Sequence, residues 1–209
     1  MLRRFSVSAL ALLLSAPLAA QAPAGWQMRV DRSTNAADPD DVPDVKFVTM
    51  GSGFHVTTGP AVVLWRPSNT ATGAYTIKAR FRLVKPSGHN NYYGLVFGGE
   101  DLAGAGQNYL YFLVAQNGTF IIKHRGGDAT HDVKARTANA AVARPDSTGS
   151  SVNVLEVRVA ADKIDYVVNG IVVHTTPKSG MTAKTEGLWG LRVNHQLEVH
   201  VDQVEKAIG

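Results

Sequence analysis

Residues 92–125, YYGLVFGGEDLAGAGQNYLYFLVAQNGTFIIKHR, predict a β-sheet. In their second half, two runs of aromatic and branched residues flank the pair Asn117-Gly118. An Asn-Gly pair between apolar runs indicates a β-hairpin, because both residues accept the positive φ angles of a type I′ turn. The strands expected here are residues 92–98, 109–116 and 119–125. A glycine-rich polar loop, residues 99–108, joins the first strand to the hairpin.

The rest of the chain continues this pattern. Residues 73–83 alternate between apolar and polar side chains, which predicts a strand with one face in the core and one in water. Asn169-Gly170 predicts a second two-residue hairpin turn. Residues 126–151 are polar and weakly patterned, which predicts a long connection with one short helix at most, in residues 135–143. The other expected strands are residues 26–30, 46–50, 54–57, 61–65, 152–160, 163–168, 187–193 and 197–204. Ten to twelve strands without a repeat predict an all-β protein, a two-sheet antiparallel sandwich of jelly-roll type.

The first residues predict export. Arg3 and Arg4 precede an apolar run, and small residues follow it up to Ala22. This is the pattern of a secretory signal peptide, residues 1–22, and the run is too short to span a membrane. We therefore expect a single β-sandwich domain, residues 23–209, in the periplasm or outside the cell. The chain has no cysteine, so its stability must come from one large core.

Charge excludes two classes of partner. The formal net charge of +4 falls to +2 when Arg3 and Arg4 leave with the leader. The remaining chain has no long Lys/Arg cluster, which argues against binding to nucleic acid or to an anionic membrane surface. It also has no second apolar stretch of spanning length, so we do not expect a membrane-embedded protein.

Three stretches together resemble a known family. They are residues 92–125, residues 153–174 (NVLEVRVAADKIDYVVNGIVVH) and residues 187–206 (GLWGLRVNHQLEVHVDQVEK). They resemble the concanavalin A-like lectin and glucanase jelly roll, in particular its secreted bacterial branch of 3-keto-disaccharide hydrolase-like domains. The resemblance covers nearly all of the chain after the leader. It implies a concanavalin A-like jelly roll and a function involving sugars.

The sequence departs from the catalytic pattern of this fold. Laminarinase-like glucanases carry the run E-x-D-x-E on one strand, so that two carboxyl groups flank the sugar bond, and no such run occurs here. Glu198, His200 and Asp202 share one face of the last strand, and we expect them to be exposed surface residues. The G-x-S-x-G, H-E-x-x-H and P-loop motifs are also absent. Whether the protein is an enzyme stays open, and the missing motifs favour a non-enzyme.

No cofactor or metal is expected from the sequence. The seven histidines are scattered singly, which favours surface histidines over a metal site assembled in space. One loop is rich in acids, namely Asp38, Asp40, Asp41 and Asp44. Clustered oxygen ligands could bind calcium, but a solvated turn is the commoner structure for such a loop.

The residue types in and around the strands expected in residues 92–125 suit the binding of a saccharide. A sugar offers an apolar ring face to an aromatic side chain and paired hydroxyls to amides, carboxylates and arginine. The candidate ligand-binding residues are Asn91, Tyr92, Glu100, Asp101, Gln107, Asn108, Tyr109, Tyr111, Lys123, Arg125 and Arg192. Alternation places Tyr109, Tyr111 and Arg125 on one face, which we expect to be concave and to join Arg192. The alternative is that the two tyrosines form a second layer of core.

Two tryptophans are assigned differently. Trp65 stands at a strand end and is expected to be exposed, whereas Trp189 is expected in the core.

The preferred function is an exported carbohydrate-binding protein. The alternatives are a 3-keto-glycoside hydrolase or lyase that acts in the concave groove, and a structural or adhesion domain.

Overall fold

The computed structural model describes residues 22–35 and 37–208, and the description below concerns those residues. Apart from Ala22, the expected signal peptide lies outside them. Fourteen strands and two short 3-10 helices make up the regular structure of this part of the chain. No helix within it is long and apolar enough to cross a membrane.

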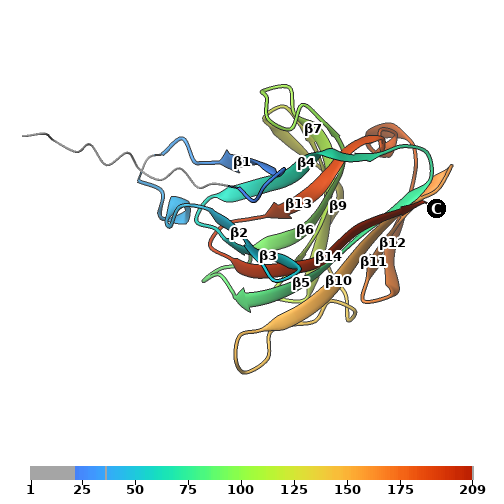
Figure 1. The fold of residues 1–209 in the computed structure, drawn as a ribbon. Coiled ribbons are helices and arrows are strands. Elements are labelled where there is room, and N and C mark those ends of the chain that lie inside the picture. The colour runs from blue at the N-terminus through green and yellow to red at the C-terminus, as the bar shows by residue number, and fades with distance from the viewer. Residues whose placement is uncertain (1–21, 36, 209) are drawn as a thin grey trace, which may run out of the picture.

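The strands form an antiparallel sandwich of two sheets with seven strands each (Figure 1). In chain order the elements are β1 (Gln27–Asp31), η1 (Pro39–Asp41), β2 (Lys46–Met50), β3 (Gly53–Thr57), β4 (Ala61–Ala71), β5 (Tyr75–Lys85), β6 (Tyr92–Glu100), β7 (Asn108–Ala115), β8 (Thr119–Gly126), β9 (Ala129–Ala138), β10 (Ser151–Val159), β11 (Lys163–Val168), β12 (Ile171–Pro177), η2 (Gly180–Thr182), β13 (Gly187–Val193) and β14 (Glu198–Ile208). The first sheet has the order β1-β4-β13-β6-β7-β8-β9, and the second has the order β12-β11-β10-β5-β14-β3-β2. This is the concanavalin A-like jelly roll that the sequence predicts.

The core lies between the two sheets, and it consists of the inward-facing residues of strands in which buried and more exposed residues alternate. On β5, the alternate residues Tyr75, Ile77, Ala79 and Phe81 are buried, while the residues between them are more exposed. The ring of Phe81 lies 5.5 Å from that of Tyr93 on β6, so the two sheets meet there. Trp189 belongs to this core, as expected.

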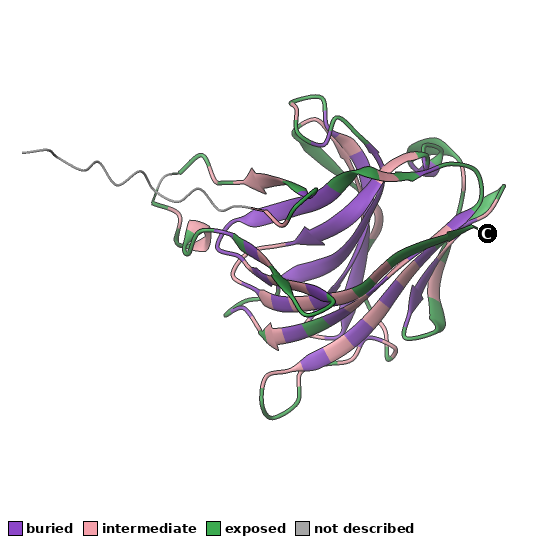
Figure 2. Cartoon of the chain, in the orientation of Figure 1, coloured by how far each residue is buried: buried purple, intermediate pink, exposed green. Residues whose placement is uncertain are grey.

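The two sheets differ in burial. Strands of the second sheet alternate between buried and exposed residues, whereas β6 and β7 of the first sheet are buried along almost their whole length (Figure 2). Strands buried on both faces carry near-continuous apolar runs rather than alternating ones. The outer face of the first sheet therefore has a cover of its own.

The Asn-Gly turn at residues 169–170 is confirmed. Val168 pairs with Ile171, and φ is +51° at Asn169 and +82° at Gly170. Two consecutive positive φ angles define a type I′ turn.

The turn at residues 117–118 differs from its prediction. Strands β7 and β8 are joined by three residues, 116–118, and only Gly118 among them has a positive φ, +81°. A three-residue loop that ends in the left-handed region is the next most common hairpin connection. The hairpin was therefore predicted correctly, but its turn type was wrong.

Two further expectations are wrong. Residues 126–151, expected to be one long connection, contain strand β9 at the edge of the first sheet. Trp65 is buried, with 3% of its surface exposed, because β4 continues through it to Ala71 and its side chain packs on the outer face of the first sheet.

Candidate functional site

A second apolar cluster covers the outer face of the first sheet. On β7, Leu110 and Phe112 point into the core, while Tyr109 and Tyr111 belong to the outer cluster. The buried members of the outer cluster are Val63, Trp65, Tyr92, Val96, Leu102, Tyr109, Tyr111, Leu113, Ala115 and Ile121. Leu102 lies in the loop between β6 and β7, which folds over this face.

One contact across the sheet shows that the β6–β7 loop folds over this face. Arg29, on the edge strand β1, donates a hydrogen bond from Nη1 to the carbonyl of Gly104 in the β6–β7 loop. In the sheet, β4 and β13 lie between β1 and β6. The loop therefore reaches over two neighbouring strands to the edge strand. We keep the name concave face for this outer face of the first sheet, after the shape that the sequence predicts for it.

Arg192 organises the polar groups of the concave face. Its Nη1 donates to Asp31 Oδ2 at 3.0 Å and to Tyr109 OH at 2.9 Å, and its Nε donates to Asn194 Oδ1 at 3.0 Å. The guanidinium also lies over the Tyr111 ring, 5.4 Å from its centroid. Asp31 accepts a second hydrogen bond, 3.0 Å long, from Arg29 Nε.

Electrostatics keep Arg192 charged and its tyrosine neighbours neutral. Burial acts to lower the pKa of Arg192, but Tyr109 and Asp31 outweigh it, so the pKa is raised. Burial raises the pKa values of Tyr109 and Tyr111, and the positive charge of Arg192 opposes this in part. The tyrosine hydroxyls therefore remain donors and acceptors at neutral pH.

Gln107 has a buried amide without a partner. The residue is fully buried, and neither Oε1 nor Nε2 has a hydrogen bond. Gln107 immediately precedes β7, and the alternation of β7, if continued one residue beyond its start, directs the side chain to the same side as Tyr109, toward the concave face. A buried polar atom without a partner costs free energy, so such a pair of atoms in a protein calls for an explanation.

Two further basic residues border the concave face. Arg125 donates from Nε to the carbonyl of Gly127 at 2.6 Å, and Lys123 Nζ lies 3.0 Å from Asp132. Their side chains keep 16% and 29% of their surface exposed, more than the 10% of Arg192. Solvent therefore reaches both of them better than it reaches Arg192.

The structure places the other predicted site residues elsewhere. Asn91 and Tyr92 lie at the beginning of β6, and Glu100 and Asp101 lie at and just beyond its end. The two ends of this nine-residue strand are about 26 Å apart, at about 3.3 Å per residue. The concave face therefore gathers Gln107, Tyr109, Tyr111, Lys123, Arg125 and Arg192 and leaves the rest at its ends.

These remaining residues have structural partners. Asn91 donates to Ser87 Oγ at 3.0 Å, and the hydroxyl of Tyr92 lies 3.1 Å from Thr119 Oγ1. Asp101 Oδ2 accepts from the amide of Gly106 within the loop, and Asn108 Oδ1 lies 3.1 Å from His124 Nε2. Glu100 is exposed, and Lys184 Nζ lies 3.5 Å from its carboxylate.

Two residues of the concave face were missed from the sequence. Arg29 and Asp31 alternate along β1 with Met28 and Val30, which pack against the core. This alternation was visible in the sequence. It did not indicate that β1 would lie beside β4 and direct these charges toward Arg192.

The acidic loop supplies its own hydrogen-bond donors. Asp38 accepts from the amide of Asp40, which lowers the pKa of Asp38, and Asp41 accepts from the amide of Ser33. Asp44 is paired with Arg32 and Asp40 with His89. These partners fit a structured turn.

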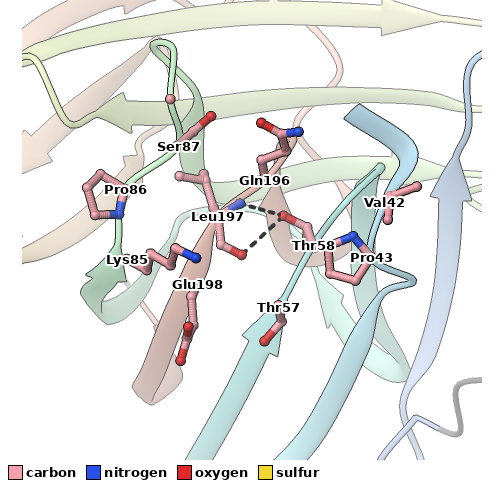
Figure 3. A pocket seen from close by; sticks show the side chains of 11 residues that line it. Val42, Pro43, Thr57, Thr58, Lys85, Pro86, Ser87, Gln196, Leu197 and Glu198 are labelled. Carbon is pink, nitrogen blue, oxygen red and sulfur yellow. Dashed lines mark hydrogen bonds between the residues drawn. The ribbon is translucent and has the colours of Figure 1, made fainter. Parts of the chain in front are cut away.

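A separate pocket of about 370 Å³ opens at one end of the second sheet (Figure 3). Thr58 and Leu197 form part of its wall and are joined by hydrogen bonds through Thr58 Oγ1. Lys85 and Glu198 carry the charged groups that line it.

Comparison with known proteins shows which solved structures share this fold. The sequence matches no protein-family model and no curated protein. The structure is similar to carbohydrate-binding module CBM66 from Bacillus subtilis, with a TM-score of 0.61 and 14% identity over 87% of this chain and 94% of the module. A protein of unknown function with a galectin-like fold, also from Bacillus subtilis, gives a TM-score of 0.63 and 14% identity over 88% of this chain and 89% of that one. Alginate lyase A1-II′ gives 0.53 and 14% identity over 78% and 83%. At these identities the likeness concerns the fold alone.

Proposed function

We propose that this protein binds a saccharide on the concave face of its first sheet. The observation that carries the proposal is the fully buried amide of Gln107, whose Oε1 and Nε2 lack partners and which stands two residues before Tyr109 of the Arg192 network. An amide offers a donor and an acceptor in one plane, which suits two neighbouring sugar hydroxyls. Fold similarity to a carbohydrate-binding module supports the same assignment.

The structure changes the role that we assign to the tyrosines. Only 1% of Tyr109 and 5% of Tyr111 is exposed, and Arg192 covers the ring of Tyr111. Their rings therefore pack beneath the surface of this face. We expect Arg125 to contact a sugar at the surface, and the buried tyrosine hydroxyls and the Gln107 amide to contact it once the β6–β7 loop moves aside. Stacking on an open aromatic floor is not part of this proposal.

A glycan array followed by titration calorimetry tests the proposal. We expect Arg125→Ala to weaken binding about tenfold or more, because a hydrogen bond with a charged partner contributes about 1.5–3 kcal/mol. Gln107→Met should weaken it about tenfold, because two hydrogen bonds of the neutral amide, about 0.5–1.5 kcal/mol each, are lost. Arg158→Ala is the matched control, since Arg158 lies on β10 of the second sheet and pairs there with Glu156. Unchanged affinity in both test variants, with the fold intact, would place the site elsewhere.

A finer proposal is that the protein belongs to the 3-keto-disaccharide hydrolase-like branch and cleaves its sugar. The motif resemblance supports it, and the concave face supplies one carboxylate, Asp31, within the network that contains Tyr109. Hydrolysis of a 3-keto-disaccharide by the protein, lost in Asp31→Asn, would support this reading. Binding without turnover would favour a binding protein, and neither binding nor turnover would favour a structural or adhesion domain.

We also propose that the protein is exported. The basic start, the apolar run and the small residues before Ala22 support this location. Mass spectrometry of the protein recovered from the periplasm or medium should give a new N-terminus after Ala20 or Ala22. An intact N-terminus on protein that stays in the cytoplasm would contradict export.

A further inference from the structure

Two histidines and a glutamate meet on the outer face of the second sheet. His55 of β3 and His200 of β14 are direct cross-strand partners, with ring centroids 5.0 Å apart. Glu198 precedes His200 by two residues, so it projects from the same face of β14. Its Oε1 lies 3.7 Å from His55 Nε2. These side chains are half-buried and clustered, which corrects the expectation of an exposed Glu198 and His200 and of singly scattered histidines.

The three side chains have the donor set and spacing of a metal site. One ligand atom from each residue lies within 4.8 Å of the others. In a tetrahedral zinc site, bonds of about 2.0–2.2 Å place neighbouring ligand atoms about 3.3 Å apart. Small side-chain rotations close this difference without moving the strands. Two imidazoles and a carboxylate suit zinc and related transition metals, whereas calcium prefers oxygen ligands alone.

We infer that His55, Glu198 and His200 bind a divalent transition-metal ion, for which zinc is the suitable probe. Among the described residues this is the one group of three that can converge on an ion. The assignment concerns a site separate from the concave face, since it lies on the other sheet of the sandwich.

Neighbouring groups restrain the cluster and leave its ligands available. Thr57 Oγ1 lies 3.0 Å from His55 Nε2, the nitrogen that also faces Glu198, so an ion bound there replaces this contact. Asp202 is paired through Oδ2 with Arg80 at 2.9 Å, and it does not belong to the group whose ligand atoms converge. Arg82 faces His200 from β5, but its Nε is directed to Ser150 Oγ at 3.2 Å.

The site has room for a ligand that is not from the protein. Three protein ligands leave one tetrahedral position open, as in catalytic rather than structural zinc sites. Glu198 also lines the pocket of about 370 Å³, together with Thr57 (Figure 3). One of the three ligands, Glu198, therefore borders a hollow that can admit water or a small anionic group.

Titration calorimetry with zinc chloride tests the inference. The protein is purified without a histidine tag and treated with chelator before the titration. We expect saturable binding of one ion per chain. His55→Ala and His200→Ala should each weaken it by at least about tenfold, and Glu198→Gln should also weaken it. Calcium chloride should give no saturable binding at these residues.

His131→Ala is the matched control. His131 stacks on His124 across β8 and β9, so this pair resembles the proposed site in residue type but lacks the third ligand. Zinc affinity should be unchanged in this variant. The inference is overturned if zinc does not bind, or if it binds equally well to the His55 and His200 variants while their thermal unfolding shows an intact fold. Either result leaves the saccharide proposal standing, because that proposal rests on the first sheet.

Discussion

A single side chain, Gln107, links stability to binding on the concave face. Its amide is buried without a hydrogen-bond partner, whereas the comparable amide of Gln116 is bonded to both backbone groups of Ser87. A buried amide without partners destabilises the folded chain, and a ligand that supplies the missing hydrogen bonds recovers that free energy. A role in ligand binding therefore explains the presence of Gln107 better than a role in folding does.

This contrast predicts opposite effects for two matched substitutions. Gln107→Met keeps the length of the side chain and removes the unpaired polar atoms, so the free energy of unfolding without ligand should rise by about 1–3 kcal/mol. Gln116→Met removes two satisfied hydrogen bonds, 2.9 and 3.0 Å long, and should lower it by a similar amount. Urea unfolding of both variants measures this. A loss of stability in Gln107→Met would mean that its amide has partners in solution.

Alternation in the sequence predicted part of the candidate site at this scale. It placed Tyr109, Tyr111 and Arg125 correctly on one face of the hairpin, because side-chain direction in a strand depends only on a period of two. Burial of these residues depends on the curvature of the sheet and on the loop above it, which no local pattern encodes. His55 and His200 are far apart in the chain, so only the pairing of β3 with β14 brings them together.

At the scale of elements, turns with positive φ angles determine how the strands pair. Gly170 occupies the second position of the type I′ turn between β11 and β12, with φ at +82°. The neighbouring Asn169 donates from its side chain to Ala141 O at 2.8 Å and accepts from the amide of Val154 at 2.8 Å. The turn is therefore tied to β10 as well as to its own strands.

Gly170→Ala tests the need for this backbone conformation. A Cβ at this position would meet nothing within 4 Å, so the cost is conformational rather than steric. The left-handed region costs an L-residue about 1–2 kcal/mol, and we expect a loss of that size in chemical unfolding. Gly88→Ala is the control, because a Cβ there is equally free and φ does not lie in the left-handed region. Equal stability of the two variants would contradict the role assigned to the turn.

Strand β9 shows why one element escaped prediction. A two-residue loop, Gly127-Asp128, joins it to β8, and φ of Gly127 is +56°. Glycine at the first central position fits a type II′ turn, so a turn signal was present. The strand itself lies at the sheet edge and is largely exposed, so it lacks the buried apolar residues by which strands are recognised.

At the scale of the whole molecule, the fold was predictable because hydrophobic alternation and turn residues agreed along most of the chain. What the sequence did not encode locally was the packing order of the strands. That order brings β1 beside β4 and β14 between β5 and β3. It thereby creates the concave face and the histidine cluster, and it also buries several tyrosines in or against the common core.

These buried tyrosines predict alkaline unfolding. Burial raises the pKa of Tyr166 from an ordinary 10.0 to about 12, and burial likewise raises the pKa values of Tyr75 and Tyr93. Between pH 10 and about 12 the unfolded chain loses phenolic protons that the folded chain retains. Stability is therefore fully present below pH 10 and is lost as pH rises through this window, by on the order of 2–3 kcal/mol for Tyr166 alone.

Circular dichroism and phenolate absorbance, followed together against pH, measure this transition. We expect the β-sheet signal to disappear and the buried tyrosines to ionise at the same pH, because ionisation requires unfolding. Tyr166→Phe should move the midpoint to higher pH and cost little at neutral pH, since the Tyr166 hydroxyl has only a 3.4 Å contact with Thr176 Oγ1. Ionisation of all tyrosines near pH 10 with the sheet signal intact would show that solvent reaches them in the folded protein. That result would contradict the burial of the tyrosines in the core and of those in the outer cluster.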